Sequence, residues 1–243
     1  MFTTLFFQPI FNLLVLFYNN IPGHDFGLAI IALTIVIKLL LYPLSQKTIK
    51  SQKALSELQP KIEDLKKEHG SKKEDLARAT MSLYKEHKIN PFSSCLPLLI
   101  QLPFMFAVFR VFQDFGKKDH AALVYGFIGQ PDFSNGLKFL QFIDLAKPNV
   151  YLAVMAASAQ YWQTKMMMSD KLPAKSESGK EENFAAIMNK QMLYMMPIMT
   201  IVIGITLPGG LTLYWFVFSL FSAIQQVIVF KTRKLIASEI IAR

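Results

Sequence analysis

Five apolar stretches, each long enough to cross a lipid bilayer, constrain the fold of this chain more than any other feature. They lie at about 27–45, 93–113, 149–166, 191–207 and 211–230. A backbone inside lipid must satisfy its own hydrogen bonds, which leaves helices and closed barrels as spanning structures. Apolar stretches of about 17–25 residues fit a helix across the hydrocarbon core. The sequence therefore predicts an all-α polytopic membrane protein with five transmembrane helices.

A single charged side chain interrupts the first of these stretches. Lys38 follows the uncharged run 27–37, and a charge at that depth costs roughly 2.5–3.5 kcal/mol on insertion scales. One interpretation is that the long lysine side chain reaches the membrane interface, since the span is expected to end near Ser45. The other is a functional charge inside the membrane. The residues alone leave both interpretations open.

The distribution of lysine and arginine predicts on which side of the membrane each loop lies. Segment 46–92 and the tail after residue 230 are rich in these residues, whereas segment 116–147 holds few. Cytoplasmic loops carry an excess of them, so we expect the first long loop and the C-terminus in the cytoplasm and the N-terminus outside. The net charge of +9 follows from this topology and does not require DNA binding. Contact with anionic lipid headgroups or ribosomal RNA is compatible with it.

The segments outside the spans have distinct predicted structures. The first twenty residues contain no charged side chain but several amides and threonines, which favours an interfacial helix, with a sixth span as the alternative. Segment 46–92 has apolar residues at helical spacing on a charged background, broken at 69–71, and predicts a helical hairpin. Pro60 predicts a kink or a new helix start within it.

The complete predicted organisation follows the chain in order. An N-terminal interfacial amphipathic helix (1–22) is followed by the first span (23–45), a cytoplasmic helical hairpin (46–92), the second span (93–113), an external segment (114–148), the third span (149–166), a cytoplasmic loop (167–190), the fourth span (191–207), an external turn (208–210), the fifth span (211–230) and a cytoplasmic tail (231–243).

Reactive and metal-binding side chains form no recognisable pattern. Cys95 is the single cysteine, so an intramolecular disulfide is excluded. The four histidines are scattered, without the spacing of metal ligands or of a catalytic triad. The sequence therefore favours neither an enzyme nor a protein with a metal or cofactor.

Polar residues inside the predicted spans are candidates for a shared site. Thr34 and Lys38 are four residues apart and lie on one helix face. Further polar or amphipathic groups could converge with them on a wet cavity between helices: Gln101, Gln191, Thr212, Tyr214, Trp215 and Gln225. For each residue alone the alternative is an interhelical hydrogen bond, and for the two aromatic residues a place in the interfacial belt.

Four motifs resemble the YidC/Oxa/Alb family of membrane protein insertases. The stretch 34–44 (TIVIKLLLYPL) is similar to the family's first core span, and 53–62 (KALSELQPKI) to the start of its cytoplasmic hairpin. The run 84–91 (YKEHKINP) leads into 95–103 (CLPLLIQLP), a distinctive family string. The stretch 208–215 (PGGLTLYW), with Gln225 and Gln226, resembles the last span.

The resemblance implies five helices around a hydrophilic groove that opens to the cytoplasm and the lipid but is closed towards the outside. In the family the positive charge of the groove attracts acidic residues of a substrate, whose apolar segment then enters the lipid without ATP. By motif position Lys38 takes the charged role, and Gln191 and Trp215 fall where family groove residues lie. Together with Thr34, Tyr214 and Gln101 they form the predicted substrate groove.

Two positions depart from the family pattern. Bacterial members usually have arginine where Lys38 stands, and Ser219 replaces an asparagine of the last span. The chain resembles the small bacterial type without the large external domain.

The sequence thus predicts an insertase and folding chaperone for small membrane proteins in the bacterial plasma (inner) membrane. The implied partners are nascent membrane proteins and membrane lipids, with the ribosome and the Sec translocon as candidates. A small anion transporter or channel that binds its ion at Lys38 is the alternative function. A structural assembly subunit is a second alternative.

Overall fold

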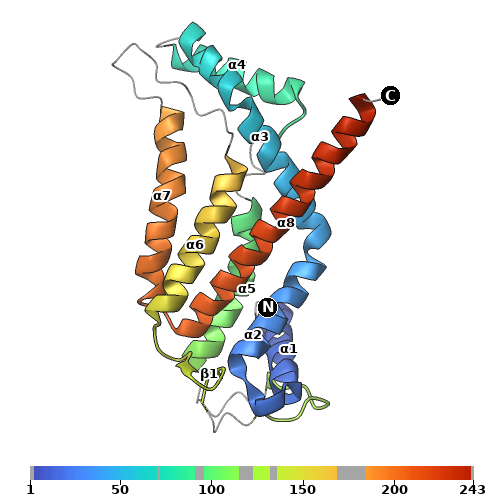
Figure 1. Cartoon of the computed structure of the whole chain (residues 1–243), viewed down its shortest axis with the longest axis vertical. Helices are drawn as coiled ribbons and strands as arrows, with labels where there is room; N and C mark the ends of the chain where they lie inside the picture. Colours follow the sequence, from blue (N-terminus) through green and yellow to red (C-terminus); the bar gives the residue numbers. More distant parts are fainter. Residues whose placement is uncertain are drawn as a thin grey trace.

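The computed structural model describes residues 3–69, 72–90, 96–114, 123–131, 136–168 and 184–241. Cys95 and His120, most of the predicted loop 167–190 and part of the external segment lie outside the described residues. The described elements are helical apart from one short β-hairpin (Figure 1). In chain order they are η1 (Thr3–Phe7), α1 (Gln8–Asn20), η2 (Pro22–His24), α2 (Phe26–Leu40), α3 (Tyr42–His69), α4 (Lys73–Glu86), α5 (Leu96–Asp114), β1 (Lys138–Phe139), β2 (Ile143–Asp144), α6 (Val150–Met167), α7 (Phe184–Gly204) and α8 (Gly209–Ile241).

Helices α2 and α6 pack against the long helix α8, with α5 beside it, and α7 packs mainly against α6 (Figure 1). Small side chains line the face that α6 turns to its neighbours, where Ala153, Ala156 and Ala157 are buried. Gly204 of α7 lies so close to α6 that an added Cβ would meet the Ala153 Cβ at 2.8 Å. The small residues of α6 therefore allow α7 to approach it closely.

The predicted first span differs from the structure near its C-terminal end. Helix α2 ends at Leu40, and α3 begins at Tyr42 with a bend of 70° between them. Pro43 lies in the first turn of α3, where proline's missing N–H and fixed φ are tolerated. The same residue would disrupt the interior of a helix that continued from α2. The apolar stretch 27–45 is therefore not one straight helix.

Helices α3 and α4 form the predicted helical hairpin and extend away from the bundle (Figure 1). The two helices contact each other, and Leu58 and Ile62 of α3 are buried. The helix ends at His69, as the pattern indicated. Pro60 does not end a helix, because α3 continues through it without a break.

A β-hairpin and the N-terminal helix cap the opposite end of the bundle from the helical hairpin (Figure 1). The strands β1 and β2 are antiparallel, with Phe139 opposite Ile143, and within the described ranges they are the one departure from helical secondary structure. Asp25 joins this cap to α2: one carboxylate oxygen accepts from the Leu28 N–H at 2.8 Å and the other from the Leu140 N–H. The N-cap of α2 therefore also holds the turn of the hairpin.

Helix α1 is built into the core. Phe7, Phe11, Leu14 and Tyr18 are buried in one cluster with residues of α2 and α5. Asn12 ties the helix to the external segment, since its amide donates to the Leu123 carbonyl and accepts from the Tyr125 N–H. An orientation along the membrane surface stays a prediction for α1.

The apolar helices differ in how well each one alone would cross a membrane. Within the described ranges, residues 209–231 of α8 form one unbroken helix with a mean hydropathy of 1.7, long and apolar enough to span. The pair α2 and α3 qualifies as a span broken at the 70° bend, and 101–112 and 193–204 are shorter apolar helices. The structure thus agrees with an all-α membrane protein, while the count of five spans stays a prediction.

Candidate functional site

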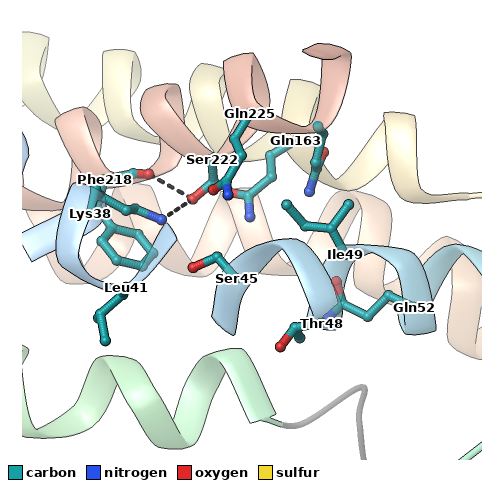
Figure 2. Close-up of a pocket in the computed structure, with 11 residues that line it drawn as sticks. Lys38, Leu41, Ser45, Thr48, Ile49, Gln52, Gln163, Phe218, Ser222 and Gln225 are labelled. Carbon is teal, nitrogen blue, oxygen red and sulfur yellow. Dashed lines mark hydrogen bonds between the residues drawn. The ribbon is translucent and has the colours of Figure 1, made fainter. Parts of the chain in front are cut away.

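A polar pocket opens between the α2–α3 bend, α6 and α8 (Figure 2). It contains about 520 Å³ of empty space, part of it continuous with the outside. Lys38 lies at one end of the pocket and Gln52 at the other, so that the pocket runs from α2 towards the helical hairpin (Figure 2). Its lining residues are Lys38, Leu41, Ser45, Thr48, Ile49, Gln52, Gln163, Phe218, Ser222, Gln225 and Gln226.

Lys38 points into this pocket and is buried, with 3% of its surface exposed. Its Nζ donates to the Ser222 hydroxyl at 2.5 Å, and Ser222 in turn donates to the Phe218 carbonyl at 2.8 Å (Figure 2). The ammonium also lies 3.3 Å from the centroid of the Phe218 ring, in the arrangement of a cation–π contact. The structure thus favours a charge held inside the protein over one that extends along the helix to the interface.

Helix α3 supplies polar groups along one wall of the pocket. Ser45, Thr48 and Gln52 are three and four residues apart and therefore share one helix face. The Thr48 hydroxyl is satisfied by the Leu44 carbonyl at 3.0 Å. The bend after α2 is what turns this face towards α8.

Two glutamines of α8 form the facing wall. The Gln225 amide nitrogen donates to the Tyr42 carbonyl at the α2–α3 bend, at 3.3 Å. The side-chain carbonyl oxygens of Gln225 and Gln226 are buried and have no hydrogen-bond partner within the described residues. Such acceptors are uncommon, because an unsatisfied buried polar group costs about 1–3 kcal/mol.

The charge of the pocket is uniformly positive. Among the described residues that line it, Lys38 is the one charged side chain, and the remaining polar groups are hydroxyls and amides. A pocket of this kind can bind a carboxylate by charge and hydrogen bonds, and neutral polar groups by hydrogen bonds alone.

The structure does not bring all six predicted groove residues together. Thr34 is fully buried one turn from Lys38, but its hydroxyl donates to the Ile30 carbonyl of its own helix at 2.7 Å. Gln101 donates to the Tyr214 hydroxyl at 2.7 Å, which joins α5 to α8 outside the pocket. Gln191 is exposed and contacts Met195 of its own helix, and Trp215 is half-buried. Lys38 alone of the six lines this pocket, and the role of the other five stays a prediction.

Several lining residues were not singled out by sequence reasoning. Ser45, Thr48 and Gln52 follow a predicted span and read as the start of a charged helix, although their helical spacing was a usable signal. Ser222 and Phe218 carry no charge and gave no signal. Their role depends on the side chain they meet, which is Lys38 from a distant part of the chain.

A helical chain with long apolar helices and a cation in a polar pocket between them has the features of an integral membrane protein with an intramembrane polar site. The sequence over residues 16–236 matches the 60Kd inner membrane protein family, and the chain belongs to this family. Membership of this family identifies the chain as a protein of the inner membrane.

Relatives named membrane protein insertase YidC match most of the chain. The Fusobacterium nucleatum protein is 35% identical over 207 residues, which are 85% of this chain and 87% of the relative. The Clostridium tetani protein is 35% identical over 194 residues, 80% of this chain and 76% of the relative. The Magnetococcus marinus protein is 33% identical over 215 residues, but the match spans only 34% of that longer chain.

Proposed function

We propose that this protein is an energy-independent membrane protein insertase that uses the pocket around Lys38 as part of a positively charged groove. The observation that carries the proposal is the Lys38 ammonium, buried in a polar pocket between helices of a chain whose relatives are named insertases. The chain inserts small membrane proteins from the cytoplasmic side and helps them fold.

Capture of the substrate begins with an exchange of partners at Lys38. In the structure the ammonium is held by a neutral hydroxyl and an aromatic ring. A carboxylate of a substrate forms a stronger, charge-assisted hydrogen bond than either, so an acidic residue in the translocated flank displaces these contacts. The polar flank then enters the pocket and avoids the hydrocarbon.

The driving force for insertion is transfer of the substrate's apolar segment into lipid. A span of about 20 apolar residues gains on the order of 10 kcal/mol or more from burial, at about 25 cal/mol per Å² of apolar surface. The insertase therefore needs to lower the barrier for the polar flank rather than supply energy.

The helical hairpin supports recruitment in this proposal. Helices α3 and α4 extend from the pocket end that Gln52 occupies (Figures 1 and 2), and their surface is rich in lysine. We propose that the hairpin lies in the cytoplasm and receives nascent membrane proteins there, alone or with the ribosome and the Sec translocon. The N-terminus lies outside and the C-terminus in the cytoplasm of a bacterial cell.

Insertion into liposomes that contain the purified chain tests the proposal. The substrate is a short single-span protein with an acidic external tail, and insertion is measured as protection from added protease. Loss of one charge-assisted hydrogen bond predicts a fall of about 10- to 100-fold in the insertion rate for Lys38→Ala. Lys38→Arg should restore the rate, and Lys38→Glu should abolish insertion.

The matched control is the same substrate with a neutral tail, whose insertion should depend much less on Lys38. Full insertion of the acidic tail by Lys38→Ala would refute charge capture but not the insertase itself. Absence of insertion by the wild-type chain, together with a Lys38-dependent anion flux into the liposomes, would favour a small anion transporter or channel.

A further inference from the structure

Gln225 and Gln226 provide a feature of the pocket that charge capture does not use. Within the described residues, the buried side-chain atoms that lack a hydrogen-bond partner are the amide oxygens of Gln101, Gln225 and Gln226. Two of these three border the pocket, and both residues are 2% exposed. Other buried polar side chains of α8 are satisfied internally, such as Ser222 by the Phe218 carbonyl and Thr212 by the Gly204 carbonyl.

The two glutamines lie next to the charged end of the pocket. Ser222, Gln225 and Gln226 are spaced i, i+3 and i+4 and therefore share one face of α8. Ser222 holds the Lys38 ammonium, and the two glutamines follow Ser222 on α8 by about one helical turn, roughly 5.4 Å along the axis. An extended polypeptide advances about 3.3 Å per residue. One to two residues of such a chain thus cover the distance.

The chemistry of the pocket restricts what the free oxygens can bind. They accept hydrogen bonds, so an anion meets two acceptors that repel it. The Lys38 ammonium next to them disfavours a cation. A neutral group that has both a donor and an acceptor fits both ends, and the peptide unit is such a group.

We propose that Gln225 and Gln226 bind the main chain of the substrate's polar flank, by accepting hydrogen bonds from its peptide N–H groups. This inference rests on the proposed insertase function. It adds hydrogen bonds to the substrate's main chain to the charge interaction at the same site. An extended flank inside the pocket has lost water from its N–H groups, and the glutamine oxygens replace that water. Because every residue except proline offers an N–H, this binding does not depend on the side chains of the flank.

A proline scan of the substrate tests the proposal. The tail consists of alanine and serine with one aspartate, and each of the two positions on either side of the aspartate is changed in turn from alanine to proline. With the wild-type chain, proline at one of these positions should lower the insertion rate about five- to tenfold, the effect of one lost hydrogen bond. Gln226→Met should lower insertion of the tail without proline by the same factor.

The decisive comparison combines the two changes. In Gln226→Met the proline should cause no further loss, because the hydrogen bond it removes is already absent. Val227→Met is the matched control: this neighbouring side chain is 42% exposed and faces away from the pocket, so the full proline effect should persist. Gln226→Asn keeps an uncharged amide acceptor and should retain a proline effect.

Three results would overturn the inference. Insertion of the tail without proline by Gln226→Met at the wild-type rate would mean that the oxygens do not bind the substrate. An undiminished proline effect in Gln226→Met, or its complete loss in Gln226→Asn, would refute the hydrogen bond to the main chain. The result for Gln226→Asn is available even where the methionine variant fails to fold. Absence of insertion by the wild-type chain would instead refute the proposed function, and this inference with it.

Discussion

Gly27 allows the β-hairpin to approach α2 without a side chain between them. A Cβ at this position would lie 2.2–2.5 Å from atoms of the Phe139 side chain, closer than such contacts can be. The ring cannot yield easily, because β1 pairs with β2 and Asp25 holds the turn next to Phe139. One missing methyl group therefore decides how the cap sits on the bundle.

Gly27→Ala should destabilise the protein by about 1–3 kcal/mol, the usual cost of overpacking a core. We expect the Tm in detergent to fall by roughly 2–10 °C. Gly126→Ala is the matched control, since a Cβ there meets nothing within 4 Å, and its Tm should stay unchanged. If the clash is the cause, Gly27→Ala should cost less in a Phe139→Ala background; equal costs in both backgrounds would contradict the packing explanation.

Single residues differ in how far the sequence could predict their role. Lys38 could be predicted as special because a charge inside an apolar run is costly wherever the chain folds. The Gln101–Tyr214 hydrogen bond matches the alternative of an interhelical contact. Ser222 could not be predicted, since a serine in an apolar helix is unremarkable until its neighbour is known. The same holds for Asp25, whose second oxygen binds a turn more than 110 residues away.

At the scale of elements, helix periodicity predicted the helical hairpin but not the course of its first helix. Pro60 lies inside α3, where contacts with α4 and the bundle outweigh one lost hydrogen bond. Pro43, by contrast, coincides with the α2–α3 bend. The same residue type has opposite outcomes because its effect depends on tertiary packing. The bend is also what places polar residues of α3 opposite α8 in the pocket.

The helical hairpin contains a buried acid that makes its stability depend on pH. Glu63 of α3 is 9% exposed, and burial raises the pKa of its carboxyl above the ordinary value of 4.5, partly offset by Lys66 and Lys67. The folded hairpin thus binds this proton more tightly than the unfolded hairpin. Stability should therefore fall as the pH rises from about 4.5 through the raised pKa.

Glu63→Gln removes this charge and should stabilise the hairpin at pH 7. The measurement is amide hydrogen exchange of α3 and α4, corrected for the intrinsic rate at each pH. Protection in the variant should exceed that of the wild type at pH 7, and the difference should vanish towards pH 4.5. Glu74→Gln is the control, because Glu74 is exposed. Greater protection of the wild type at pH 7 would mean that Glu63 gains more from its lysines than it loses by burial.

For the whole molecule, the sequence predicted the helical class and the family. The length of the apolar stretches and the four separated motifs can be recognised without any knowledge of tertiary contacts. The sequence did not predict how the two ends of the bundle are closed. Leu145 and Lys147 accept hydrogen bonds from the N–H groups of Gly210 and Gly209 at 3.0 and 2.9 Å. These bonds join the external segment to the start of α8 and involve only backbone, so side-chain patterns do not reveal them.

The count of membrane crossings depends on α6, which is less apolar than the span of α8. Its buried face consists of small residues against α7 and α8. Its outer face presents Val154, Met155 and Trp162, each more than 40% exposed. An apolar outer face is stable in lipid and costly in water, so α6 should cross the membrane with its neighbours.

Accessibility of single cysteines to a membrane-impermeant maleimide tests this, in a Cys95→Ser background. Phe142→Cys in the external hairpin, with a wild-type residue that is 91% exposed, should be labelled from outside in intact cells. Arg78→Cys in α4 and Lys231→Cys at the end of the α8 span should be labelled only after permeabilisation. Three helices separate residues 142 and 231, so opposite sides require an odd number of crossings among α6, α7 and α8. Labelling of residues 142 and 231 from the same side would mean an even number of crossings among these three helices. In that case α6 would be the first candidate for a helix that does not cross.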